Sequence, residues 1–254
     1  GYRKYVSYLV LLLLALVAPI IIKSDYLREV FVLTYIFALL ALSFDIVMGW
    51  MGQFDFGHAA FFGLGVYGGA LVSEGSHGLG LSPWLGFLAG IVAAAALAAP
   101  IGYISLRKLR GWYLAIVTFG FGGVLYLVAL NWYDLTLGMT GIYNIPYPII
   151  ALPGLPSIAL SSSFSYYYFT LSLLILALYL ISRLLRTRFG RALISLRENE
   201  ELARSTGVNA LKHYLVAFTL AGALAGLAGA TWVFYIRSAS PMQLGLSYLF
   251  MMLN

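Results

Sequence analysis

The sequence predicts an all-α, polytopic helical membrane protein, and composition, long apolar runs and the placement of charge all support this fold class. The chain has 254 residues, of which 62% are hydrophobic and 9% are charged, whereas a soluble domain is about 25% charged. Fifteen basic and nine acidic residues are too few to cover the surface of a soluble globule of this length. The high hydrophobicity also excludes a disordered chain, so the apolar helices are expected to lie in a bilayer.

Recurrent apolar runs predict about seven to eight transmembrane segments in this chain. A helical crossing needs about 20 residues, and most of the runs are long enough. The run 58–73 is short and glycine-rich, and a last stretch, 244–253, is too short to span. Because the sequence stops inside this stretch at Asn254, we expect it to be truncated at its C-terminus. The predicted spans are 6–22, 30–48, 58–73, 82–105, 113–130, 165–182 and 214–236.

The basic residues predict the orientation of the spans. Ten of the fifteen fall in two loops, one between the fourth and fifth runs and one between the sixth and seventh. Two spans separate these loops, so both lie on one side, which the positive-inside rule makes cytoplasmic. The run 58–73 can cross the membrane or re-enter it, and each topology leaves twelve basic residues inside and three outside. Charge counting leaves both open, and a spanning segment is the preferred interpretation.

The chain 1–254 is interpreted as one transmembrane domain with two long loops. The loop 131–164 has Asp134 as its only ionised residue and four prolines, which predicts an external cap. The loop 183–213 is basic and cytoplasmic, so the net charge of +6 reports topology and indicates no nucleic-acid partner. The sequence has no cysteine and none of the common hydrolase or nucleotide-binding motifs. We therefore predict a protein that is not an enzyme and that holds no cofactor or metal.

Signals in the cytoplasmic loop predict a short helix at about 198–206. Ser195 and Glu198 have the S-x-x-E spacing of a capping box. Glu200 and Arg204 form an i,i+4 pair in the favoured order, and Gly207 is a typical helix stop.

This helix has a small apolar side, Leu202 and Ala203, beside a charged side. It could be a surface helix that merely joins two spans. The preferred interpretation is a docking helix that fits a groove in a cytoplasmic partner, because a simple tether has little need of such definite end signals.

The segment from Asp45 to Gly63 predicts a broken helix. A carboxylate in an apolar run is functional by default, although Asp45 could instead lie near the inner interface and cap the next turn. Glycines at 49, 52 and 57 favour close backbone approach or an interrupted helix of the kind that lines transport sites. His58 has no nearby metal-ligand companion, so a hydrogen-bonded packing role is preferred to a proton relay.

A third group, in the run 113–130, places a polar residue and gaps in the middle of a span. It comprises Thr118, Gly120, Gly122 and Gly123. Helix packing alone would explain these residues, and a place on a translocation pathway is the alternative.

Four segments together resemble one family in their order and spacing. They are Gly49 to Gly63, residues 113–122, the Asn131 to Ile142 stretch, and Gly190 to Asn209. The resemblance is to the permease family of bacterial and archaeal ABC importers for branched-chain amino acids, and it is closest to the larger of the two permease types. It extends from about residue 30 to residue 243 and is specific to the family, not to the substrate.

The resemblance implies a multi-pass permease subunit in the inner or plasma membrane that imports branched-chain or other hydrophobic amino acids, or related small amides or urea. Its implied partners are a second permease subunit, two cytoplasmic ATPase subunits that use the ATP, an extracytoplasmic substrate-binding protein and the lipid bilayer. The rival interpretation is a self-sufficient channel or ion-coupled secondary transporter, which would need ion-binding charges within the membrane. Asp45 is the strong candidate for such a charge.

Site residues follow from these patterns and from the resemblance. The residues expected to couple the chain to an ATPase are Arg197, Glu198, Glu201, Ala203 and Gly207. The candidates for the translocation pathway are Asp45, Gly49, Gly52, Gln53, Gly57, His58, Thr118 and Gly120. Asp55 and Phe56 depart from the small or hydroxylic residues that relatives often carry at these positions.

Overall fold

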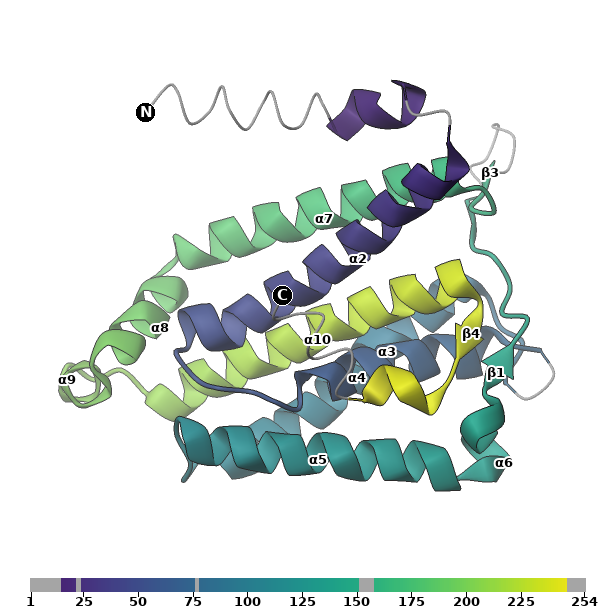
Figure 1. Cartoon of the computed structure of the whole chain (residues 1–254). Coiled ribbons are helices and arrows are strands. Elements are labelled where there is room, and N and C mark those ends of the chain that lie inside the picture. Colours follow the sequence, from purple (N-terminus) through teal and green to yellow (C-terminus); the bar gives the residue numbers. More distant parts are fainter. Residues whose placement is uncertain (1–14, 22–23, 76–77, 151–157, 246–254) are drawn as a thin grey trace.

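The computed structural model describes residues 15–21, 24–75, 78–150 and 158–245 (Figure 1). Residues 15–21 are helical. The remaining helices are α2 (Asp25–Asp45) with a π-helical turn η1 (Ile46–Trp50), α3 (His58–Ser73), α4 (Pro83–Leu106), α5 (Trp112–Asn131), α6 (Tyr133–Thr136), η2 (Gly138–Thr140), α7 (Ser163–Leu185), α8 (Arg188–Glu198), α9 (Glu200–Ser205), α10 (Ala210–Ile236) and η3 (Pro241–Leu244).

Short strands form two antiparallel pairs between the helices. β1 (Ile142–Tyr143) pairs with β4 (Ser238–Ala239), and β2 (Ile149–Ile150) pairs with β3 (Ile158–Ala159). The first pair ties the connection after α5 to the end of α10.

Within the described ranges, five helices are long and apolar enough to cross a membrane. These are α2 with η1, α4, α5, α7 and α10, whereas α3 has 16 residues and is shorter. The mostly helical class is therefore confirmed, with five candidate spans. The predicted run 6–22 and the stretch 244–253 lie largely outside the described residues.

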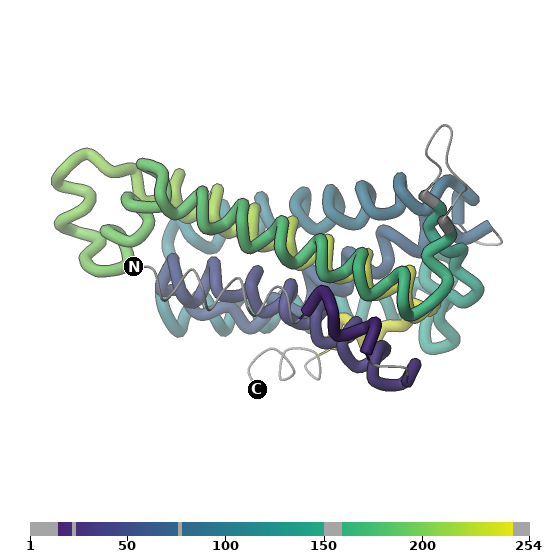
Figure 2. Tube along the Cα trace, turned by 90° about the horizontal axis from the view of Figure 1, so that it is seen from above, coloured from purple at the N-terminus to yellow at the C-terminus, as the bar shows by residue number. Residues whose placement is uncertain are grey.

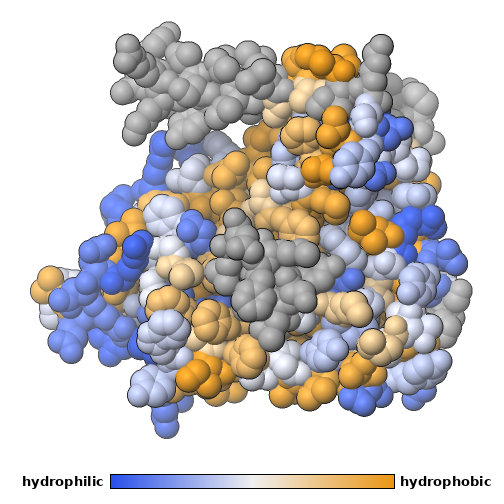
Figure 3. Space-filling model, in the orientation of Figure 1, coloured by the Kyte–Doolittle hydropathy of each residue, from blue (hydrophilic) through white to orange (hydrophobic). Residues whose placement is uncertain are grey.

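The long helices run along a common direction between two ends (Figures 1 and 2). At one end, here called the α8–α9 end, the Tyr214 hydroxyl of α10 donates to the Leu196 carbonyl of α8. At the other, the β1–β4 end, the guanidinium of Arg28 in α2 lies over the ring of Phe164 in α7. Blue hydrophilic residues gather over the α8–α9 end, and orange apolar residues dominate the middle (Figure 3).

The segment between α2 and α4 passes from one end of the molecule to the other. α2 ends near α8 and α9, and α4 begins near the β1–β4 end, where the Trp84 indole donates to the Ile149 carbonyl. α3 covers part of this path, and the non-helical residues 51–57 cover the rest. Arg28 and Arg237 lie at the β1–β4 end, which is the charge distribution required by the topology in which this segment crosses.

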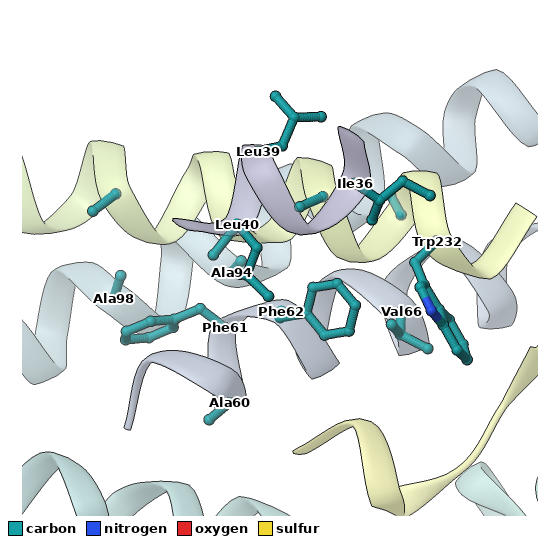
Figure 4. Packing of buried hydrophobic residues seen from close by; sticks show 14 of the residues in the cluster. Ile36, Leu39, Leu40, Ala60, Phe61, Phe62, Val66, Ala94, Ala98 and Trp232 are labelled. Atoms are coloured by element: carbon teal, nitrogen blue, oxygen red, sulfur yellow. The ribbon is translucent and has the colours of Figure 1, made fainter. Parts of the chain in front are cut away.

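The core is built from α3, α4 and α10, which pack against one another through small residues (Figure 4). A Cβ atom at Gly65 of α3 would collide with the Gly226 carbonyl oxygen of α10, so these backbones are in direct contact. Ala94 and Ala98 of α4 face the same helix. Small residues allow the close approach that strengthens helix packing in membranes, and the large side chains Phe61 and Phe62 fill the remaining space.

Candidate functional site

The non-helical segment 51–57 is held along α5 by three contacts. The Gly111 amide donates to Gln53 Oε1 at 2.9 Å. The Phe54 ring stacks on Trp112 with centroids 4.6 Å apart. Backbone groups freed by a broken helix need partners inside a membrane protein, and the Phe56 amide finds one in Thr118 Oγ1 at 3.1 Å.

Three buried polar side chains hold the other side of the segment. His58 lies between Asp55 and Ser43, and all three are fully buried. His58 Nδ1 is 2.9 Å from Asp55 Oδ2, and His58 Nε2 is 2.8 Å from Ser43 Oγ. The second carboxylate oxygen, Asp55 Oδ1, accepts from the Gly57 amide at 3.0 Å. This cluster connects α2, the segment 51–57 and the start of α3.

The direction of these hydrogen bonds follows from Ser43. Its hydroxyl donates to the Leu40 carbonyl at 2.6 Å, so its oxygen accepts the proton of His58 Nε2. Nδ1 of the same ring and Asp55 Oδ2 then share one proton between them. A serine nucleophile must give its proton to the histidine, so this Ser-His-Asp group is not arranged as a hydrolytic triad.

A cavity of about 530 Å³ opens beside this segment. One wall is Phe56, Gly57, Ala59 and Ala60, the second is Phe119, Gly122, Gly123 and Tyr126 of α5, and the third is Ser240, Met242, Gln243, Leu244 and Gly245. The lining is mainly apolar with a few polar groups, as in most sites for small molecules. The first turn of α3 faces the cavity, and the N-terminus of a helix carries a positive partial charge.

The pathway candidates are only partly brought together. Gly57 lines the cavity, and Thr118 and His58 are buried behind the wall. Gly120 is exposed, and no atom lies within 4 Å of an added Cβ. Asp45 is also exposed, and its carboxylate accepts from Trp50 Nε1 at 2.8 Å within its own turn. The structure places both of these residues away from the cavity.

Sequence reasoning missed the third wall, which η3 supplies. Ser240 and Gln243 form a capping box: the Ser240 amide donates to Gln243 Oε1 at 2.7 Å. The spacing Ser-Pro-Met-Gln is itself a signature of a helix start, so it could have been found. η3 lies at the end of the region that resembles the family, where the apolar stretch 244–253 begins.

The predicted helix at 198–206 corresponds to α9 (Glu200–Ser205), and a separate helix, α8, precedes it. α8 ends at Glu198, and α9 begins at Glu200. The cap predicted at Ser195 is wrong, because Ser195 lies inside α8 and its hydroxyl donates to the Ala192 carbonyl. Asn199 takes an extended conformation and its Oδ1 accepts from the Leu202 amide at 2.9 Å, so it caps α9 instead.

The end of α9 matches the predicted stop. Gly207 has φ +88°, its amide donates to the Arg204 carbonyl, and the Val208 amide donates to the Ala203 carbonyl, which is a Schellman motif. Ala203 is buried, and Leu202 remains 65% exposed. Glu198 and Glu201 are also exposed, so α9 presents one apolar side chain among charged ones.

Arg197 connects α8 to the end of α2. Its guanidinium donates to the Gly49 carbonyl, and its Cγ lies 2.8 Å from where a Cβ at Gly52 would be. Gly52 has φ +66°, a left-handed conformation that favours glycine. Gly49 and Gly52 were predicted to line the pathway. In the structure they instead contact Arg197, which was predicted to couple the chain to an ATPase.

Glu200 forms the densest charged cluster in the described residues, although it was predicted only as a partner of Arg204. Arg110 donates to it through Nε at 2.9 Å and Nη2 at 3.2 Å, and Arg204 Nη2 lies 2.6 Å away. Burial raises the pKa of the Glu200 carboxyl, but hydrogen bonding to Arg110 and the charges of Arg110 and Arg204 outweigh it, so the pKa lies below its usual value. The cluster fixes the start of α9 against the 107–111 loop.

The chain matches the family described as branched-chain amino acid transport system / permease component over residues 26–253. It is 35% identical over 238 residues to the high-affinity branched-chain amino acid transport system permease protein LivM of Escherichia coli (strain K12), covering 86% of this chain and 55% of the relative. The identity and coverage are the same for LivM of Salmonella typhimurium (strain LT2).

The chain spans about half the length of the curated relatives it matches. No solved structure matches it. The family match covers most of the chain, and it includes the segment 51–57, the cavity and both helices of the basic loop. The chain belongs to the family of branched-chain amino acid transport system permease components.

Proposed function

We propose that this chain is the transmembrane permease subunit of an ATP-driven importer in the cell inner membrane, and that it moves branched-chain or other hydrophobic amino acids. The observation that carries the proposal is how the cavity is connected to the cytoplasmic loop. Two of its walls are formed by residues 51–57 and by α5. Each of these walls is attached to the loop that bears α8 and α9. Family membership and the printed names of the relatives support the substrate class. The run 6–22 is expected to add a further span to those described.

The cavity has the chemistry that an aliphatic amino acid requires. Phe56, Phe119 and Leu244 offer apolar surface to a branched side chain. The first turn of α3 offers a positive partial charge to a carboxylate, as broken helices do in transporters. Small amides and urea share the polar part of this chemistry, and they lack the aliphatic side chain that the apolar walls favour.

The attachments form a closed ring of contacts at the α8–α9 end. Arg197 holds Gly49, which leads into the segment 51–57. Gln53 of that segment holds the Gly111 amide at the start of α5. The ring closes through Arg110, which neighbours Gly111 and binds Glu200 three residues after Arg197. A displacement of α8 and α9 therefore acts on both cavity walls together.

Such a ring suits alternating access, in which ATP shifts an equilibrium between two states through contacts made in only one of them. We assign the docking contact to α9, with Leu202 as its apolar anchor. The implied assembly contains two ATPase subunits that consume the ATP, a second permease subunit and an extracytoplasmic binding protein. The exposed face of α5, which includes Tyr113, Ile116 and Val124, is available to lipid or to the second permease.

The experiment combines purification with transport. The full-length protein is co-expressed with the ATPases, second permease and binding protein of its transport system, and ATP-driven uptake of labelled leucine is measured in reconstituted vesicles. Leu202→Asp is expected to release the ATPases during purification and to lower uptake at least tenfold, because a buried charge in a docking groove is costly.

The matched control is Leu79→Asp, which places the same charge on a leucine that is 71% exposed at the β1–β4 end. This variant should retain the ATPases. Retention of the ATPases by Leu202→Asp would refute the docking role of α9. Leucine uptake driven by an ion gradient without any ATPase would refute the importer and favour a secondary transporter.

A further inference from the structure

Packing alone does not explain why Asp55 and His58 occupy this place in the core. Both side chains are fully buried, and burying ionisable groups is costly unless they are paired and hydrogen-bonded. An apolar pair would fill this place in the core without that cost. The pair also lies immediately beside Phe56 and Gly57, which form one wall of the cavity.

The two carboxylate oxygens of Asp55 have different hydrogen-bond partners. Oδ1 accepts from the Gly57 amide two residues on, which fixes the turn that leads into α3. Oδ2 binds the His58 ring, whose other nitrogen is held by Ser43 on α2. One oxygen therefore shapes the turn locally, and the other anchors the turn to a neighbouring span.

We propose that Asp55 and His58 are positioning residues for the cavity wall: a proton shared between them and directed by Ser43 clamps the segment 51–57 onto α2 and so sets where Phe56 and Gly57 lie. The opposite side of the segment rests on α5, through Phe56 and Thr118. The clamp determines how far the wall stands from α2, and hence the shape presented to the substrate. This inference rests on the proposed transport function and assigns the affinity of the cavity to a pair that does not line it.

Substitutions at position 55 separate the two tasks of the carboxylate. Asp55→Asn can accept from the Gly57 amide and donate to His58 Nδ1, so it keeps both contacts. Asp55→Ser can reach the Gly57 amide but not the ring. We expect Asp55→Asn to keep the half-saturating leucine concentration within about threefold of the wild type, and Asp55→Ser to raise it about tenfold, the usual scale for a buried group left unpaired.

His58→Gln provides the second arm of a double-mutant cycle. Its amide can still donate to Ser43, but Asp55 Oδ2 loses its partner. If the pair acts as one unit, the double variant Asp55→Ser/His58→Gln should transport no worse than the poorer single variant. If the two substitutions impair transport independently, so that their effects multiply in the double variant, the proposed clamp is refuted.

A spectroscopic measurement tests the pair without transport. The chain has three histidines, so ring nitrogen resonances of the ¹⁵N-histidine-labelled protein in detergent can be assigned by loss of one set in His58→Gln. The His58 Nδ1 resonance should move in Asp55→Ser and stay in place in Asp45→Asn, a control at an exposed acid bound to Trp50. If the His58 Nδ1 resonance is unchanged in Asp55→Ser, the proposal that Asp55 and His58 share a proton is refuted.

The two proposals fail in different ways. If the assembled wild-type protein shows no ATP-driven leucine uptake, the proposed function fails and the nitrogen resonances still report on the pair. If the wild type transports leucine and Asp55→Ser does so with an unchanged half-saturating concentration, the positioning role fails and the importer stands. Comparable amounts of inserted protein, and retained ATPases, confirm that each variant is folded.

Discussion

Two glycines predicted for the pathway, Gly57 and Gly120, differ in the space around them. A Cβ at Gly57 would collide with the Thr118 carbonyl oxygen of α5, whereas a Cβ at Gly120 would meet no atom within 4 Å. Backbone cannot yield as a flexible side chain can, so the added methyl group at position 57 must displace the segment 51–57 from α5. The substitution to alanine is the same at both positions, and only the surroundings differ.

Gly57→Ala is therefore expected to destabilise the protein by about 1–3 kcal/mol, the range for an overpacked site, and to impair transport. Gly120→Ala should be neutral or stabilising by up to about 1 kcal/mol, because alanine favours a helix interior. Unfolding in mixed micelles at increasing denaturing detergent measures both. Equal stability of the two variants would contradict the described contact between segment 51–57 and α5.

Glu200 makes stability depend on pH with a definite sign. Its folded-state pKa is lowered, so its contribution is present above the unfolded pKa of about 4.3 and is lost as the pH falls through the folded value. Glu200→Gln should lower the free energy of unfolding by about 1 kcal/mol at neutral pH, because the side chain is 25% exposed and partly screened.

The test compares detergent-induced unfolding of Glu200→Gln and wild type from pH 7 down to the lowest pH at which both remain folded. The difference should shrink as the pH falls below about 4.3. Glu201→Gln, at the exposed neighbouring position, is the control and should change little at any pH. A difference that stays constant with pH would show that the charge of Glu200 is not what stabilises the cluster.

At the scale of elements, α9 depends on a cap that the sequence pattern placed elsewhere. The S-x-x-E spacing suggested Ser195, but Asn199 holds the Leu202 amide. Asn199→Ala should destabilise α9 by about 1 kcal/mol and weaken retention of the ATPases. Ser195→Ala, in the middle of α8, should be close to neutral. Hydrogen exchange of the amides of α9, measured by mass spectrometry, distinguishes the two variants. Equal protection of these amides in both variants would contradict the assignment of the cap to Asn199.

Hydropathy predicted the long helices well because a bilayer crossing sets both their length and their composition. The predicted run 113–130 corresponds to α5 and 214–236 lies within α10. Hydropathy could not predict that Asn199 divides the basic loop into α8 and α9. Several local capping signals compete in this loop, and the tertiary burial of Leu193 and Leu196 decides which signal is used.

The candidate site was predictable only in part for a related reason. The glycines identified the broken segment at 51–57, since close backbone approach leaves a mark in the sequence. The link from His58 to Ser43 on α2, the bond from Arg197 to the Gly49 carbonyl, and the wall made by η3 depend on contacts between separate segments of the chain. Periodicity and composition carry no information about such contacts.

At the scale of the whole molecule, the structure favours one of the two topologies that charge counting left equal. Arg28 lies at the end opposite α8 and α9, so the path from residue 51 to residue 73 runs from one end of the molecule to the other, and we propose that it crosses the membrane. The absence of cysteine from the sequence makes this directly testable, because each introduced cysteine is the sole thiol. Three exposed serines suit the test: Ser24 before α2, Ser161 before α7 and Ser205 in α9.

Each serine is replaced by cysteine and treated with a membrane-impermeant maleimide in vesicles of known orientation. Ser24→Cys and Ser161→Cys should react from the extracytoplasmic side, and Ser205→Cys only from the cytoplasmic side, because the basic residues of its loop are retained inside. The re-entrant topology places Ser24 with Ser205 instead, so the side on which Ser24→Cys reacts distinguishes the two. Labelling of Ser24→Cys from the cytoplasmic side would show that the segment 51–73 returns to the side on which it began, and would refute the crossing topology.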